Sequence, residues 1–230
     1  MASNEPKVAL LAGASGFVGG YVLDSLLDAP DFSRVFAISR RPLGREHSRL
    51  ANRIVQFEKL ETQLKGMQCQ VAFCCLGTTM KHAGSEKAFR AIDYDLVLSF
   101  ARAAKAAQAQ RFVVVTAGGA DPRSKNFYLR VKGEVEQALE GMGFAALDIL
   151  QPGLLLGWRR GELRPLELLA SAVMPLVNPF LGGGRIGFRA IPARTVAAAA
   201  LGAARSGRRG VYRYNYPALR QLAQLRAARR

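Results

Sequence analysis

Cysteine and histidine are scarce in this chain. Its 230 residues include two histidines, 35 residues apart, and three cysteines, Cys69, Cys74 and Cys75. Neither set has the spacing of metal ligands or of a disulfide framework, so we expect no metal site and no disulfide-stabilised fold. The segment Met1–Lys7 is polar and does not resemble a signal peptide. Together these features predict a reducing, cytoplasmic location.

Long hydrophobic runs are also missing. The most apolar late segment, Leu168–Leu181, has 14 residues and contains Pro175, Asn178 and Pro179. A helix needs about 20 apolar residues to cross a bilayer, so we expect no transmembrane segment. A packed wall or a lid over a pocket are the two roles this segment suits.

Acidic residues are few compared with basic ones. The chain has 17 Asp and Glu residues and 33 Lys and Arg residues, which gives a net charge of +16. Residues 168–230 contain eleven Arg and no Lys, Asp or Glu, so most of the excess lies at the C-terminal end. Such a balance favours anionic partners, among them phosphorylated small molecules, an acidic membrane surface and nucleic acid. A solvated positive surface is the simplest interpretation, and nucleic-acid binding is a minor hypothesis.

Half of the residues are hydrophobic, and their order along the chain predicts an α/β fold. Apolar runs rich in β-branched and aromatic residues alternate with segments of helical spacing, most clearly Ser85–Gln108, Asn126–Leu139 and Arg194–Ala204. This alternation predicts a Rossmann-type, doubly wound parallel sheet. We expect a single domain over residues 1–230, in which residues 153–230 form a small substrate-side cap. The expected strands are Lys7–Ala12, Arg34–Ser39, a weaker Arg53–Phe57, Gln70–Leu76, Arg111–Thr116 and Ala145–Leu150.

A glycine motif joins the first expected strand to the first helix. Gly13, Gly16 and Gly19 form GxxGxxG within GASGFVGG. Glycine is required where the turn is tight, where the backbone approaches a pyrophosphate and where the helix packs on the strand. The helix N-terminus then offers N–H donors and a positive dipole to the phosphates. In this context the motif predicts a dinucleotide site.

The end of the second strand indicates which dinucleotide binds. An acidic residue there bonds the ribose 2′-hydroxyl of NAD, whereas an arginine accommodates the 2′-phosphate of NADP. The chain has Ser39, Arg40 and Arg41 at this place and no acidic residue before Glu46. The sequence therefore predicts NADP(H) in preference to NAD(H).

Tyr128 and Lys132 stand four residues apart in NFYLRVKGEVE. This spacing places both side chains on one face of a helix. A phenol has a pKa of about 10, and a neighbouring ammonium group lowers it by stabilising the phenolate. Tyr128 is therefore a candidate general acid.

These motifs, taken in order, resemble a known superfamily. GASGFVGG, SRR, CLGTT (Cys75–Thr79), YLRVK and QPGLLLG (Gln151–Gly157) are similar to an atypical, extended-like short-chain dehydrogenase/reductase. CLGTT, NFYLRVKGEVE, PGLLLG and FRAIPARTVA resemble, more narrowly, its Tat-interacting-protein-like branch of NAD(P)-binding oxidoreductases. The resemblance covers about residues 7–205.

The resemblance implies a role for each matching position. Tyr128 would exchange a proton with a carbonyl or alcohol substrate, while Lys132 would bond the nicotinamide ribose and tune Tyr128. Arg40 and Arg41 would hold the 2′-phosphate. The remaining cofactor contacts would come from the pyrophosphate-binding Gly13, Ser15, Gly16, Phe17, Val18 and Gly19, the adenosine-side Leu76, Gly77 and Thr78, and the nicotinamide-side Pro152 and Leu154.

One position departs from the family pattern. The family has a Ser or Thr just after the fifth strand that polarises the substrate carbonyl, and this chain has VVVTAGGAD there. Thr116 supplies the hydroxyl only if it faces inward; if Ala117 occupies the position, Ser124, Thr78 or a water must substitute. Loss of such a donor costs roughly 100- to 1000-fold in rate.

Four functions follow in order of preference. The first is NADP(H)-dependent carbonyl reduction or alcohol oxidation, on a small molecule whose identity the sequence leaves open. The second, prompted by Ala117, is a low-activity NADP(H)-binding regulatory or interaction protein. A nucleoside-diphosphate-sugar epimerase is third, and nucleic-acid binding is fourth. An oligomer is compatible with all of them.

Overall fold

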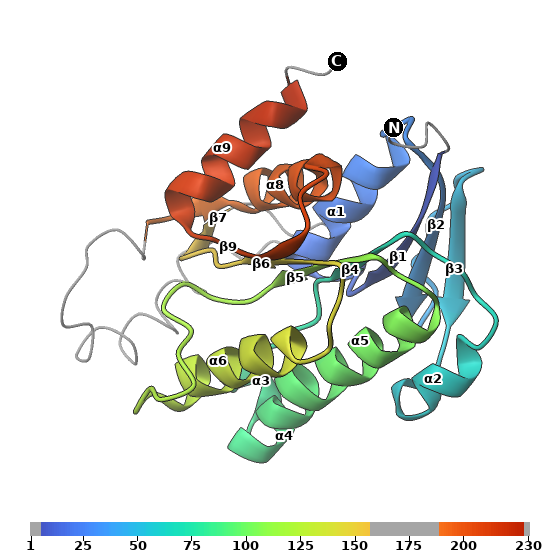
Figure 1. Ribbon diagram of the computed structural model, residues 1–230. Coiled ribbons are helices and arrows are strands. Elements are labelled where there is room, and N and C mark those ends of the chain that lie inside the picture. Colours follow the sequence, from blue (N-terminus) through green and yellow to red (C-terminus); the bar gives the residue numbers. More distant parts are fainter. Residues whose placement is uncertain (1–5, 157–188, 228–230) are drawn as a thin grey trace.

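The computed structural model describes residues 6–156 and 189–227. The described part contains a parallel sheet of seven strands in the order β3-β2-β1-β4-β5-β6-β9 (Figure 1). The predicted Rossmann-type α/β class is confirmed. The expected apolar wall at Leu168–Leu181 lies outside the described residues. The strands are β1 (Lys7–Ala12), β2 (Phe32–Ser39), β3 (Leu50–Ile54), β4 (Val71–Cys74), β5 (Arg111–Val115), β6 (Ala146–Leu150) and β9 (Gly210–Tyr214).

Helices cover both faces of the sheet (Figure 1). One layer holds α1 (Phe17–Leu27), α8 (Ala193–Arg205) and α9 (Tyr216–Ala227), packed around one buried cluster. The opposite layer holds α2 (Leu60–Gln63), α3 (Met80–Ala83), α4 (Glu86–Arg90), α5 (Leu96–Ala106) and α6 (Phe127–Glu140). No helix of the described ranges is both long and apolar enough to cross a membrane.

The strand order reverses between β1 and β4, which pair with each other in parallel. In an open α/β sheet, the connections from two such neighbours leave toward opposite faces and open a crevice beyond the strand ends, where ligands bind. The glycine turn after β1 and the loop after β4 both border this place.

Two expected elements differ from the structure. Strand β3 ends at Ile54, because the following Val55 and Phe57 are buried and lead into a 3-10 turn over Phe57–Lys59. The long helix expected over Ser85–Gln108 is divided: a π-helical turn, Ala91–Asp95, separates α4 from α5. Single π turns of this kind are frequent at functional sites.

The C-terminal elements that the structure describes belong to the main layers. Strand β9 extends the sheet beside β6, and α8 packs on α1. Arg111 of β5 and Asp148 of β6 form a buried ion pair. Tyr214 of β9 donates to Asp148 at 2.8 Å, and Arg111 donates to the Ala203 carbonyl of α8 at 3.0 Å, so these contacts connect β9 and α8 to the sheet. A small two-stranded sheet, β7 (Leu155–Leu156) with β8 (Ile191–Pro192), lies apart from the main one.

Two positions of the turn after β1 require glycine. Gly13 has φ +85°, and a Cβ there would overlap the carbonyl of Cys75 at the end of β4. Gly19 lies within α1, where a Cβ would overlap the carbonyl oxygen of Gly13. The motif therefore sets how closely α1 approaches β1 and β4.

Gly19→Ala is expected to destabilise the fold, because its methyl group has no space against the Gly13 carbonyl. We expect the free energy of unfolding to fall by about 1–3 kcal/mol, the usual cost of overpacking. The matched control is Gly20→Ala in the same helix, whose Cβ would lie 3.6 Å from the Ala14 carbonyl oxygen. Its change should be neutral or a gain of up to about 1 kcal/mol from helix propensity. Urea denaturation of both variants measures this, and equal effects would refute the packing argument.

Candidate functional site

The glycine turn leaves an anion-binding helix start. Gly16 is the N-terminal cap of α1, and no side chain caps the helix there. The first turn contains no acidic residue, so nothing on it repels a phosphate. Gly16 donates to the Gly13 carbonyl at 2.9 Å, Ser15 is exposed, and Val18 turns its side chain into the core. The turn thus offers backbone N–H groups and the Ser15 hydroxyl, the donors that a pyrophosphate requires.

Arg40 and Arg41 follow β2 directly and are exposed. Within residues 6–156 and 189–227, neither guanidinium forms an ion pair. The loop carrying them is held by Ser39, whose hydroxyl donates to the Arg41 carbonyl and accepts from Asn52, both at 2.7 Å. Two free guanidinium groups on a fixed loop can hold a phosphate bidentately.

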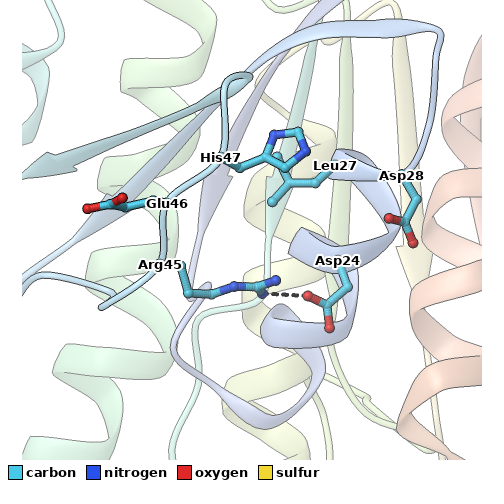
Figure 2. Close-up of a pocket in the computed structure, with 6 residues that line it drawn as sticks. All are labelled: Asp24, Leu27, Asp28, Arg45, Glu46 and His47. Atoms are coloured by element: carbon cyan, nitrogen blue, oxygen red, sulfur yellow. Dashed lines mark hydrogen bonds and ion pairs between the residues drawn. The ribbon is translucent and has the colours of Figure 1, made fainter.

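A pocket of about 350 Å³ lies between α1 and the loop that follows Arg41 (Figure 2). Asp24 and Arg45 form an ion pair across it. With three carboxylates in its wall, this pocket is unsuited to phosphate. The glycine turn and Tyr128 do not contribute to it; its lining is Asp24, Leu27, Asp28, Arg45, Glu46 and His47.

Tyr128 and Lys132 lie together on α6, as their spacing predicts. The helix begins after Asn126, whose Oδ1 accepts from the Leu129 N–H at 3.1 Å. The Lys132 Nζ lies 6.0 Å from the centre of the Tyr128 ring, and Phe89 packs on that ring at 5.5 Å between centroids. Lys132 is 5% exposed. The pair is therefore a buried ammonium group beside a phenol.

Asp93 completes this cluster, and we did not identify it from the sequence. It is fully buried, with Oδ1 at 2.7 Å from the Lys132 Nζ and Oδ2 accepting from the Thr78 N–H at 2.8 Å. Phe89, Asp93 and Val97 follow one another at four-residue intervals, and all three are buried. An acidic residue on the apolar face of a helix was the available signal.

The charges of the cluster set the protonation of Tyr128. Burial raises the pKa of Tyr128 above the ordinary phenol value; Lys132 opposes this and Asp93 adds to it. The expected lowering by Lys132 is thus present but outweighed. Burial lowers the pKa of Lys132, but Asp93, Tyr128 and Cys74 together raise it by more, and the net shift is upward. At neutral pH Tyr128 is therefore a phenol and Lys132 an ammonium ion, which is paired with Asp93.

Thr116 contacts a second buried carboxylate, that of Glu136 on α6. Its hydroxyl donates to Glu136 Oε1 at 2.6 Å, and Glu136 also accepts from Gln151 at 2.9 Å and from Arg213 at 3.2 Å. Glu136 is 3% exposed, and sequence reasoning missed it as well. A hydroxyl that donates its proton to a carboxylate has only lone pairs left for another partner.

The remaining expected residues lie at the same end of the sheet. Gly77 adjoins the cluster directly, since a Cβ there would lie 3.5 Å from the Lys132 Nζ. Pro152 follows β6, and its carbonyl accepts from Gly118 at 2.7 Å, next to Thr116. Leu154 leads into β7 and is partly exposed. The segments that follow β4, β5 and β6 therefore lie at the carboxyl ends of the strands, as does the glycine turn that follows β1.

Three comparisons agree with this geometry. A family model described as NAD(P)H-binding matches residues 13–166. Protein HTATIP2 of Rattus norvegicus is 41% identical over 168 residues, 71% of this chain and 69% of that protein. The mitochondrial protein fmp52 of Aspergillus fumigatus is 32% identical over 200 residues, 84% of this chain and 85% of that protein.

Solved structures show the same fold at low identity. A UDP-glucose 4-epimerase from Thermotoga maritima with UDP-glucose aligns with a TM-score of 0.67 at 14% identity, covering 96% of this chain and 82% of that one. MoeE5 in complex with UDP-glucose and NAD aligns with a TM-score of 0.66 at 17% identity, covering 90% and 75%.

The fungal relatives overturn one expectation from the sequence. Those of Aspergillus fumigatus and Emericella nidulans, the latter 34% identical over 167 residues, are named mitochondrial. The predicted cytoplasmic location is therefore wrong. Cysteine content reports the redox state of a compartment and does not identify the compartment.

The relatives from Rattus norvegicus and Aspergillus fumigatus are 41% and 32% identical to this chain over most of each sequence, which goes beyond a shared fold. The glycine turn, the Tyr128 and Lys132 pair and the segments after β4 and β6 all lie at the switch point where such proteins bind their cofactor. The chain belongs to the NAD(P)H-binding family.

Proposed function

We propose that the chain is an NADP(H)-dependent oxidoreductase that reduces a carbonyl compound or oxidises the matching alcohol. The observation that carries this proposal is the cluster of the partly buried Tyr128 with the buried Lys132 and Asp93, beside Gly77. It lies at the carboxyl ends of the strands, where the glycine turn also lies. A phenol poised beside an ammonium group is an acid-base pair, and the nearby turn suits a dinucleotide.

The chain's own residues fit the cofactor. Backbone groups of Gly13, Gly16, Phe17, Val18 and Gly19 with the Ser15 hydroxyl would hold the pyrophosphate, and Arg40 with Arg41 the 2′-phosphate. Leu76, Gly77 and Thr78 would border the adenosine side, whereas Pro152 and Leu154 would border the nicotinamide. Lys132 would donate to the nicotinamide ribose. When bound, the nicotinamide supplies or accepts a hydride.

Tyr128 would act on the substrate oxygen. Because its pKa is raised by burial, Tyr128 holds its proton at neutral pH and can give it to the oxygen of a carbonyl that is being reduced. The Lys132 ammonium then stabilises the phenolate that remains. For substrate binding we propose the side that begins at residue 153, of which β7 and β8 are described.

A second candidate has a specific observation in its favour. The Thr116 hydroxyl is donated to Glu136, so in this arrangement it cannot donate to a substrate carbonyl. A site without that donor binds the cofactor but turns over slowly. A low-activity NADP(H)-binding protein with a regulatory role is therefore the alternative.

NADPH should bind more tightly than NADH, and Arg40→Asp should remove the difference. Losing a charge-assisted hydrogen bond of about 1.5–3 kcal/mol lowers NADPH affinity by roughly 10- to 100-fold. The control is Arg34→Asp, an exposed arginine toward the other end of β2. Fluorescence titration with both cofactors measures the affinities. Equal NADPH and NADH affinity in the unmodified protein would contradict the cofactor assignment.

Tyr128→Phe should abolish most turnover and leave NADPH binding intact, since only the hydroxyl is lost. General acid catalysis contributes about 100- to 10,000-fold, and kcat should fall by that order. NADPH oxidation with a panel of aldehydes and ketones provides the rates, and Tyr94→Phe on the adjacent π turn is the control. If the unmodified protein binds NADPH but matches Tyr128→Phe with every substrate, the low-activity alternative replaces the enzyme.

The ionisation of Tyr128 should occur above the ordinary phenol pKa of about 10, because burial disfavours the phenolate more than Lys132 favours it. The tyrosinate absorbance of the unmodified protein minus that of Tyr128→Phe isolates this titration. In Lys132→Met the midpoint should move higher still, since the stabilising ammonium is gone. A midpoint near neutral pH would show that Tyr128 is a base in the resting protein.

A further inference from the structure

Asp93 is the one fully buried carboxylate beside Lys132 that the described ranges contain, and the proposed function assigns it no role. It lies in the π turn, Ala91–Asp95, and its Oδ1 is 2.7 Å from the Lys132 Nζ. Asp95, the last residue of the same turn, is exposed. The turn thus places one of its two acidic residues against the lysine and the other in solvent.

Lys132 needs a counter-ion because it is buried. Removing an ammonium ion from water without a partner favours the neutral amine, and unpaired buried lysines lose their proton several pH units early. Here burial is the largest influence on Lys132, and it acts to lower the pKa. A neutral amine would neither stabilise a phenolate nor present three donors to a ribose.

The other titratable groups that act on Lys132 carry no negative charge at neutral pH. Tyr128 holds its proton, since burial raises its pKa. Cys74, at the end of β4, is a thiol because burial raises its pKa to about 12. Of the groups in the described ranges that influence Lys132, Asp93 alone supplies an anion there.

Asp93 is itself fixed in place. Its Oδ2 accepts the Thr78 N–H at 2.8 Å, and Gly77 leaves the room it occupies, since a Cβ at Gly77 would lie 3.2 Å from Oδ1. The carboxylate therefore joins the loop after β4 to the lysine on α6.

We propose that Asp93 is a positioning residue, the counter-ion that keeps Lys132 an ammonium ion in its buried site and fixes the Nζ between Gly77 and Tyr128. The relevance of this role to catalysis rests on the proposed function, in which Lys132 serves the cofactor and Tyr128. The ion pair itself is a property of the protein without cofactor and is tested there.

The test follows the protonation of Lys132 in protein labelled with [ε-¹³C]lysine and free of cofactor. The chain has eight lysines, and Lys132→Arg removes one signal and so assigns it. In the unmodified protein the Lys132 signal should titrate no earlier than those of the other lysines. In Asp93→Asn, which keeps an acceptor for the Thr78 N–H but removes the charge, it should titrate at clearly lower pH.

Two variants separate the charge from the structure. Asp93→Glu restores a carboxylate and should bring the midpoint back toward that of the unmodified protein. Asp95→Asn, the exposed acid of the same turn, should leave it unchanged. An unshifted midpoint in Asp93→Asn would overturn the proposal. If Asp93→Asn does not fold, the unmodified protein still decides, because early titration of Lys132 there would refute the role.

The outcome is independent of the proposed function. NADPH titration of the unmodified protein decides whether a cofactor site exists, and the lysine signal decides whether Asp93 holds the charge. Absence of NADPH binding with an intact Lys132 shift in Asp93→Asn would remove the oxidoreductase and leave the ion pair established.

Discussion

The close approach of α1 to the ends of β1 and β4 is the constraint on which the rest of the site depends. Gly13 adopts a left-handed φ against the Cys75 carbonyl, and Gly19 lets the helix rest on the Gly13 carbonyl. A side chain at either position would push the helix away from the sheet. The segment after β4 contacts Gly13 through the Cys75 carbonyl and Lys132 through Gly77. The glycine turn and the α6 residues are therefore positioned against the same segment.

Two buried carboxylates organise the polar side of α6: Asp93 approaches it from the π turn, and Glu136 belongs to the helix itself. Asp93 forms an ion pair with Lys132. Glu136, one helical turn after Lys132, accepts hydrogen bonds from Thr116, Gln151 and Arg213. A buried carboxylate is costly unless its oxygens are paired, and both of these are. Their proposed effects are opposite: Asp93 would keep Lys132 charged, whereas Glu136 accepts the proton of the Thr116 hydroxyl, which the family pattern would direct to the substrate.

This contrast explains why the chain supports both an enzyme and a low-activity binding protein. The proposed acid-base pair lies together on α6, with Lys132 buried and Tyr128 partly buried. The hydroxyl just after β5 is also present, but its partner is Glu136. Whether turnover is fast depends on a second donor to the substrate oxygen, and a cofactor site is common to both functions.

Features that arise from local spacing could be predicted from the sequence. The strand, glycine turn and helix at the start need only Gly13, Gly16 and Gly19 and an apolar period, and Tyr128 with Lys132 share a face because they stand four apart on one helix. The remaining contacts depend on how the elements pack together. Asp93 meets Lys132 across 39 residues of sequence, and β9 joins the sheet beside β6, because burial and strand pairing depend on which surfaces the fold brings together. The sequence shows that Asp93 lies on an apolar helix face, but its partner, Lys132, can be identified only from the packing of α6 against the π turn.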